Sequence, residues 1–162
     1  MSAFSLKLLT QFLALASVVL LAATTVNADE RYNPVDNKLV IDECGGCHMV
    51  FQPQMLPKKS WAKIMDGLSD HFGEDASIDA ETARPISTYL QDNAADKGWF
   101  GGKFMRGLSD GAAPLRITET PYWVREHNEE VPARAWKDPR VKSKANCLAC
   151  HKRANSGDYD DD

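Results

Sequence analysis

The chain has 162 residues, with 19 basic and 23 acidic side chains and a formal net charge of −4. This length suits one small domain or two very small ones, so it excludes a large multidomain enzyme. The acidic balance argues against a generic nucleic-acid binder, and no apolar stretch after Ala28 is long enough to span a membrane.

Residues 1–28 have the pattern of a secretory signal peptide. Lys7 supplies the positive charge, Leu8–Ala23 is mostly apolar, and Val26–Ala28 ends in the small residues of a cleavage site. Removing these 28 of the 162 residues, Lys7 among them, leaves 134 residues with a formal charge of −5. We therefore expect an exported, periplasmic protein.

Three helices are predicted before residue 98, from boundary signals and from apolar side chains at helical spacing. Their ranges are Val35–Glu43, Ser60–Phe72 and Ala83–Asn93, and residues 52–59 form a loop between the first two. The third helix requires Pro85 to lie in its first turn, where a missing amide hydrogen costs little. Gly73 should end the second helix, which places His71 in its last turn.

The second half is richer in loops. Lys97–Pro114 contains five glycines and reads as a linker, and Leu115–Thr118 is at most a short extended piece. Thr120 and Pro121 are predicted to open a helix that Pro132 closes. A further helix should start at Asp138-Pro139 and carry the last two cysteines, followed by a mobile acidic tail, Ser156–Asp162.

The four cysteines form two pairs, and a histidine follows each pair directly. Cys44, Cys47 and His48 form one C-x-x-C-H motif; Cys147, Cys150 and His151 form the other. This is the attachment pattern of c-type haem. Two thiols at this spacing add to the two vinyl groups of one porphyrin, and the histidine becomes an axial ligand of the iron. The motifs therefore predict two covalently attached haem c groups.

Disulfides and a zinc site are the alternatives for these cysteines. A thioredoxin-like C-x-x-C expects a βαβ pattern nearby, which the sequence does not show. Zinc-binding pairs usually lie roughly 15–20 residues apart. Here Cys47 and Cys147 are a hundred positions apart, so two haems remain the favoured interpretation.

The number of histidines suggests the remaining iron ligands. The chain has four: His48 and His151 in the motifs, and His71 and His127 elsewhere. Two irons with one motif histidine each need two further ligands, and two histidines remain. Methionine is the competing ligand, with Met55 and Met105 as the credible rivals and Met49 and Met65 as weaker ones. A histidine–methionine pair would raise the redox potential relative to two histidines.

We expect a mainly α fold of two small haem-binding lobes. The N-terminal lobe, residues 29–97, has the helix, motif, loop and helix order of a class I cytochrome c. A glycine-rich linker covers 98–114. The C-terminal lobe, 115–162, is loop-rich with short helices and an acidic tail. Lobes this small have thin cores, which the haems and the four tryptophans, Trp61, Trp99, Trp123 and Trp136, are expected to complete.

Charge is distributed unevenly along the chain. Asp66 to Asp96 contains eight acidic residues and one basic one, whereas Arg134 to Arg153 contains seven basic residues and one acidic one. Ordinary solvated surface explains such runs. The functional interpretation is a dipole that orients redox partners.

Two longer stretches resemble a known family. CGGCHMVFQPQMLPKKSW with GLSDHFGEDAS in the first half, and RITETPYWVREHNEEV with KSKANCLACHKRA in the second, are similar to the small exported dihaem cytochromes c known as DHC. The resemblance implies bis-histidine irons, with His48 and His71 on the first haem and His127 and His151 on the second. It also implies two partners, a membrane cytochrome b and an oxygen-binding monohaem cytochrome, the sphaeroides haem protein.

We therefore expect a monomeric electron carrier rather than an enzyme, because an iron with both axial positions filled offers no site for substrate. The alternative is a haem enzyme or gas-binding protein, reactive toward peroxide, oxygen or nitrite, if one distal histidine can be displaced. A subunit of a larger respiratory complex is a third possibility.

Overall fold

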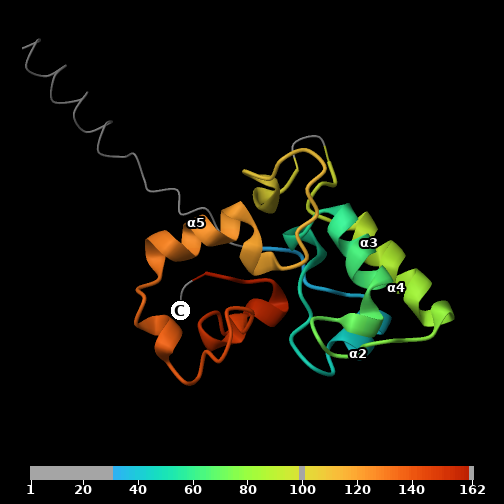
Figure 1. The fold of residues 1–162 in the computed structure, drawn as a ribbon, viewed down its shortest axis with the longest axis horizontal. Helices are drawn as coiled ribbons and strands as arrows, with labels where there is room; N and C mark the ends of the chain where they lie inside the picture. The colour runs from blue at the N-terminus through green and yellow to red at the C-terminus, as the bar shows by residue number, and fades with distance from the viewer. Residues whose placement is uncertain (1–30, 99–100, 161–162) are drawn as a thin grey trace, which may run out of the picture.

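The computed structural model describes residues 31–98 and 101–160, so the predicted signal peptide and Trp99 lie outside the described residues. Four α-helices occur in this part: α2 (Lys38–Cys44), α3 (Lys58–Asp66), α4 (Ala80–Asp92) and α5 (Pro121–Glu130). The rest consists of loops and short 3-10 turns, without a β-strand in the described ranges, which confirms the mainly α fold class. Helices α2, α3 and α4 gather on one side, and α5 lies on the other with the C-terminal segment (Figure 1). None of the helices in the described part is long and apolar enough to cross a membrane.

Helices α2, α3 and α4 form the first core. Its buried members are Val40, Leu56, Trp61, Ile86, Leu90 and Ala94. The indole nitrogen of Trp61 donates to the carbonyl of Pro53 at 2.8 Å, and the carbonyl of Leu56 accepts from the amide of Ala95 at 2.9 Å. These bonds satisfy polar groups inside the core, so the aromatic burial of Trp61 carries no desolvation cost for its N–H.

The first two predicted helices have different ends in the structure. Helix α2 begins at Lys38 rather than Val35, because the side chain of Asn37 accepts from the amide of Val40 at 3.2 Å. Helix α3 begins earlier than predicted and ends at Asp66, since Gly67 follows as its C-cap. The predicted range Ser60–Phe72 is therefore wrong at both ends, and His71 lies outside the helix.

Helix α4 begins before its predicted start. The carboxylate of Asp79 accepts from the amides of Glu81 and Thr82, both at 2.9 Å, and so caps a helix that opens at Ala80. Pro85 consequently lies inside the helix, not in its first turn. The lost backbone bond is offset by this cap and by the burial of Ile86 and Leu90 just beyond the proline.

In the second half, one predicted helix is confirmed and one is wrong. Helix α5 starts at Pro121 with Thr120 as its cap, as predicted. Between Asp138 and Asp160, where the described residues end, there is no α-helix. The carboxylate of Asp138 instead accepts from the amide of Arg140 at 2.9 Å in a local turn, and Lys142 adopts a positive φ of 59° that ends any helical run. The piece at Leu115–Thr118 contributes to a 3-10 turn, Ile117–Glu119, instead of a strand.

The C-terminal segment, predicted to be mobile, is packed into the molecule as far as Asp160. Tyr159 is buried, and its hydroxyl donates to Oε1 of Gln52 at 2.6 Å. The side-chain amide of Gln52 donates in turn to the carbonyl of Ala154 at 2.8 Å. The backbone amide of Tyr32 donates to the carbonyl of Gly157, also at 2.8 Å. Burial raises the pKa of Tyr159 well above its usual value, so it remains a neutral donor.

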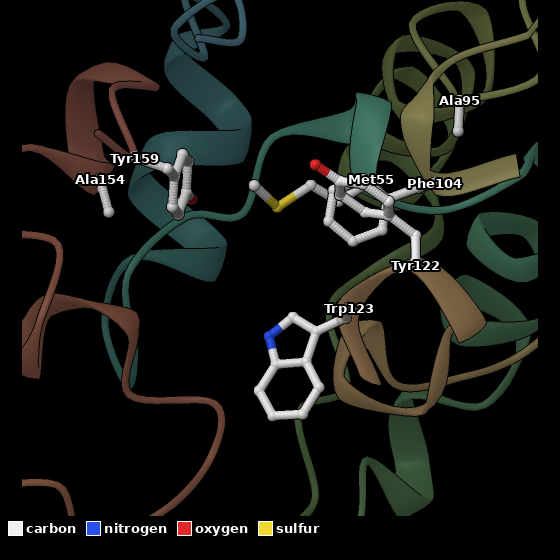
Figure 2. Close-up of a cluster of buried hydrophobic side chains, with 7 residues drawn as sticks. All are labelled: Met55, Ala95, Phe104, Tyr122, Trp123, Ala154 and Tyr159. Atoms are coloured by element: carbon white, nitrogen blue, oxygen red, sulfur yellow. The ribbon is translucent and has the colours of Figure 1, made fainter. Parts of the chain in front are cut away.

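The second core is built from both halves of the chain. Its buried members are Met55, Ala95, Phe104, Tyr122, Trp123, Ala154 and Tyr159 (Figure 2). Met55 and Ala95 precede the predicted linker and Phe104 lies within it. Ile117 is packed against both cores. Apolar contacts therefore cross the boundaries drawn at 97 and 114, and the division into lobes at those residues stays a prediction.

The bond between Tyr159 and Gln52 gives a stability prediction. Replacing Tyr159 by Phe leaves the buried Oε1 of Gln52 without its donor, which should lower the free energy of unfolding by about 1–3 kcal/mol in urea titrations of the haem-loaded protein. Tyr89→Phe is the matched control, because the Tyr89 hydroxyl donates to the exposed Asp36 at 2.9 Å. Its removal should cost less, since water replaces the lost partner. Equal losses in both variants would contradict a role for burial.

Candidate functional site

The first cysteine pair lies at the end of α2. Cys44 is the last residue of the helix and is half-buried, whereas Cys47 is exposed. Burial, reinforced by the charge of Glu43, raises the pKa of the Cys44 thiol. Gly45 accepts no larger residue without a backbone shift, because a Cβ there would collide with the carbonyl of Ile41. The helix end therefore presents both thiols and then His48.

His71 is held by a tight turn. Its amide donates to the carbonyl of Glu74 at 2.7 Å, and the amide of Glu74 donates back at 3.3 Å. The two residues between them have positive φ angles, 58° at Phe72 and 100° at Gly73, as in a type I′ turn. Left-handed backbone is unfavourable for phenylalanine, and such strain is typical of functional sites. The turn fixes the backbone of His71 in place of the predicted helix.

The structure brings His71 opposite His48. Their ring centroids lie 6.2 Å apart with the planes at 25°. Two metal–imidazole bonds of about 2 Å each, in line, hold ring centroids roughly 6 Å apart, so the pair fits one metal ion between them. Nδ1 of His48 lies 2.6 Å from the carbonyl of Met49. A carbonyl only accepts, so Nδ1 carries the proton and the lone pair is on Nε2, as a metal ligand requires.

The surroundings of this first pair are apolar and open. His48 is exposed, its ring 5.1 Å from that of Phe51, and the side chain of Phe72 is 45% exposed. A large aromatic left this exposed beside a ligand pair suits coverage by a flat apolar group. The pKa of His71 is lowered by burial and then by the charges of His48 and Arg116, which favours the neutral imidazole that binds metal.

The second cysteine pair borders a cavity. The cavity has about 860 Å³ of space between atoms, part of it open to solvent. Cys147, Cys150 and His151 line it, and His127 of α5 lines it as well. Its other walls are mostly apolar, including Trp123, Trp136, Val131, Val141 and Met55. The second core therefore encloses the space next to its own C-x-x-C-H motif.

His127 lies in the last turn of α5. Its Nδ1 donates to the carbonyl of Trp123, one turn earlier, at 2.9 Å, which again puts the lone pair on Nε2. The imidazole is stacked on the Trp123 ring at 3.9 Å and 16°. The centroid of His127 lies 6.3 Å from that of His151, with the planes at 76°. This separation matches the first pair, and the ring planes are crossed instead of near parallel.

His151 follows a 3-10 turn, Cys147–Ala149, that sets the spacing of the motif. The amide of His151 donates to the carbonyl of Cys147 at 2.8 Å. Its ring lies 5.4 Å from that of Tyr159, and its buried Nδ1 has no hydrogen-bond partner among the described residues. Burial raises the pKa of the Cys147 thiol to about 11. The thiols and the imidazole of this motif therefore border a mostly apolar cavity, which suits a tethered porphyrin.

The methionines occupy core positions. Met55 is 3% exposed, belongs to the second core and lines the cavity of the second motif, although it precedes the linker in the chain. Met49 and Met105 are packed against the same core, and Met65 against the first. Of these, Met55 alone lines the cavity, which makes it the strongest methionine rival at the second iron.

The alternatives for the cysteines find no support in the described part of the chain. None of the four, all within the described residues, takes part in a disulfide. No group of three or more His, Cys, Asp or Glu side chains placed to hold a metal ion occurs within residues 31–98 and 101–160, whereas structural zinc uses four such ligands.

Each C-x-x-C-H motif has a second histidine at a distance that leaves room for one metal ion between the two rings. Two such motifs define a c-type haem protein. Comparison with known proteins then gives the family. The model of the dihaem cytochrome c family, DHC, matches residues 40–159. The chain belongs to this family, which carries two covalently bound haem c groups and makes it a haem-based electron-transfer protein.

Solved structures agree with this assignment. The chain is 40% identical to a structure described as diheme cytochrome c from Rhodobacter sphaeroides, with a TM-score of 0.74, over 78% of this chain and 99% of that one. It is 33% identical to a diheme cytochrome c from Shewanella baltica OS155, with a TM-score of 0.63, over 76% of this chain and 87% of that one. A comparison with curated proteins gave no match.

Several residues of these sites escaped prediction from the sequence. Tyr32 and Phe104 line the second cavity, and Arg116 lies beside His71 at the first site. All three are distant in sequence from the motif they accompany. Met55 was predicted only as a rival ligand, and its place at the second motif was not foreseen. The turn residues Gly67, Ser69 and Asp70 were a usable signal that the helix ends before His71.

Removing one cysteine pair at a time should remove one haem at a time. Cys44→Ser with Cys47→Ser, and Cys147→Ser with Cys150→Ser, should each reduce the pyridine haemochrome count from two haems per chain to one. The second double variant should unfold more readily, because it leaves the enclosed cavity empty. Two haems retained in either variant would contradict attachment at that motif.

Proposed function

We propose that this protein is a periplasmic electron carrier in which His48 and His71 hold one haem iron and His127 and His151 hold the other. The observation that carries the proposal is the matched separation of the two histidine pairs, 6.2 and 6.3 Å between ring centroids, each beside a C-x-x-C-H motif. The bound haems supply reversible one-electron chemistry. The polypeptide supplies the rest.

Fixed ligands favour electron transfer over bond-making chemistry. His127 is held by its hydrogen bond and stack on Trp123, His48 by its bond to the Met49 carbonyl, and His71 by its turn. A ligand held in place changes little between oxidation states, so reorganisation stays small. The four histidines are all the chain has, which leaves no other imidazole for a distal acid–base role.

Two imidazoles on each iron favour low midpoint potentials, because methionine ligation raises them. Different exposure to solvent should give the two haems different midpoint potentials. The first pair includes the exposed His48, whereas the second faces an enclosure lined by Trp123 and Trp136. Burial in an apolar enclosure disfavours the more highly charged ferric state and so raises the potential of the second haem relative to the first.

The resemblance and the charges support partners on either side of this carrier. The proposed donor is a membrane cytochrome b, and the proposed acceptor is a soluble oxygen-binding monohaem cytochrome. All eight acidic residues between Asp66 and Asp96, and all seven basic residues between Arg134 and Arg153, are exposed. Lys144 lines the second cavity and lies 5.6 Å from the Trp123 ring. Opposite charge at the two sites would direct different partners to different haems.

Substitution of the distal histidines tests the ligation. His71→Met and His127→Met should each raise one midpoint potential, on the order of 0.1 V or more, and leave the other haem unchanged. Electron paramagnetic resonance of the ferric wild type should show two low-spin signals, because near-parallel and crossed imidazole planes split the iron orbitals differently. Met55→Leu and Met105→Leu are the controls and should alter neither signal. An unchanged spectrum in both histidine variants would refute the assignment.

Carbon monoxide separates a carrier from a gas-binding protein or enzyme. The reduced wild type should not bind carbon monoxide rapidly, since both axial positions are filled; absorbance after mixing measures this. Rapid stoichiometric binding at one haem would instead support a displaceable histidine and oppose the carrier proposal.

A further inference from the structure

Arg116 comes from beyond the glycine-rich segment and yet lies at the first haem site. The carbon at the centre of its guanidinium is 4.0 Å from the centroid of the Phe72 ring. The Phe72 ring is 4.8 Å from the ring of His71, the residue before it. A guanidinium this close to an aromatic face makes a cation–π contact. The contact places a positive charge one side chain away from a proposed iron ligand.

The backbone that carries Arg116 is anchored. Ile117 is packed against both hydrophobic cores, and its carbonyl accepts from the hydroxyl of Thr120 at 2.7 Å and from the amide of Thr120 at 3.1 Å. Thr120 is fully buried and caps α5. The position of Arg116 is therefore fixed by the fold of the second half.

The carboxylates near Arg116 are exposed to solvent. Glu119 lies 3.7 Å away, and the two side chains are 48% and 59% exposed, so their ion pair is weak and screened. The neighbouring turn carries acidic side chains, Asp70, Glu74 and Asp75, all of them exposed.

We propose that Arg116 belongs to the first haem site, where the positive charge of its guanidinium raises the midpoint potential of that iron. Reduction adds one electron from an external donor and converts ferric to ferrous iron. A fixed positive charge stabilises the state with the additional electron. The inference rests on the proposed function, since it requires His48 and His71 to hold a haem. It adds that the second half of the chain sets the potential of the first haem.

The test is a potentiometric titration of the haem-loaded protein with dithionite, followed by electron paramagnetic resonance. The signal altered by His71→Met identifies the first haem. Arg116→Gln should shift the midpoint of that haem to lower potential and leave the other in place. Arg116→Lys should retain most of the wild-type value, because it keeps the charge.

Two further variants separate charge from general structural damage. Glu119→Gln removes the counter-charge of Arg116 and should shift the same midpoint in the opposite direction, to higher potential. Arg84→Gln removes an equal charge from an exposed position on α4 and should shift neither midpoint comparably. Structural damage would not give opposite signs at Arg116 and Glu119.

Each outcome decides between the possibilities. Two bound haems with no shift in Arg116→Gln, or equal shifts at both haems, would overturn the inference while leaving the ligation intact. If His71→Met alters no signal, the proposed function fails and this inference fails with it. If Arg116→Gln does not retain two haems, Phe72→Leu replaces it. That variant keeps every charge but removes the ring under the guanidinium, and an unmoved first midpoint would overturn the inference.

Discussion

Two imidazoles that face each other at about the separation set by one metal ion are the constraint around which both halves of this chain are arranged. In each half, a short helical turn presents a C-x-x-C-H histidine. A separate element then brings a second ring to 6.2 or 6.3 Å. The element differs: a tight turn at His71, the last turn of a helix at His127. The same distance is reached by different local structures, which supports the proposal that each pair holds one haem iron.

The two halves depend on each other. The second core includes Met55 and Ala95 from before the glycine-rich segment, and the C-terminal Tyr159 bonds to Gln52 across 107 positions of sequence. In the other direction, Arg116 of the second half lies against Phe72 at the first site. A chain this small gains buried area by sharing side chains between sites. A consequence is that the environment of one haem can be set by residues from the other half.

The fold also shows where local rules fail. Pro85 lies inside α4 because the Asp79 cap and the burial of Ile86 outweigh the lost hydrogen bond. Asp138 and Pro139 have the pattern of a helix start, yet the Asp138 carboxylate bonds to Arg140 and a turn results. The acidic tail looked mobile by composition, but Tyr159 within it is buried. The contacts of Asp79 and Asp138 are local, whereas the hydrogen bond of Tyr159 joins residues far apart in the sequence.

The sequence by itself determined the cofactor chemistry, the mainly helical class, helix α5 and the set of four histidines, because motif spacing and capping residues are local properties of the chain. The tertiary structure places the histidines of each pair opposite one another, as the resemblance implied. It alone decided that Met55 and Tyr159 border the second site and that Arg116 reaches the first. Those facts depend on contacts between residues far apart in sequence. Such contacts form through burial and hydrogen bonding in the folded chain, and the hydrophobic periodicity of the sequence does not predict them.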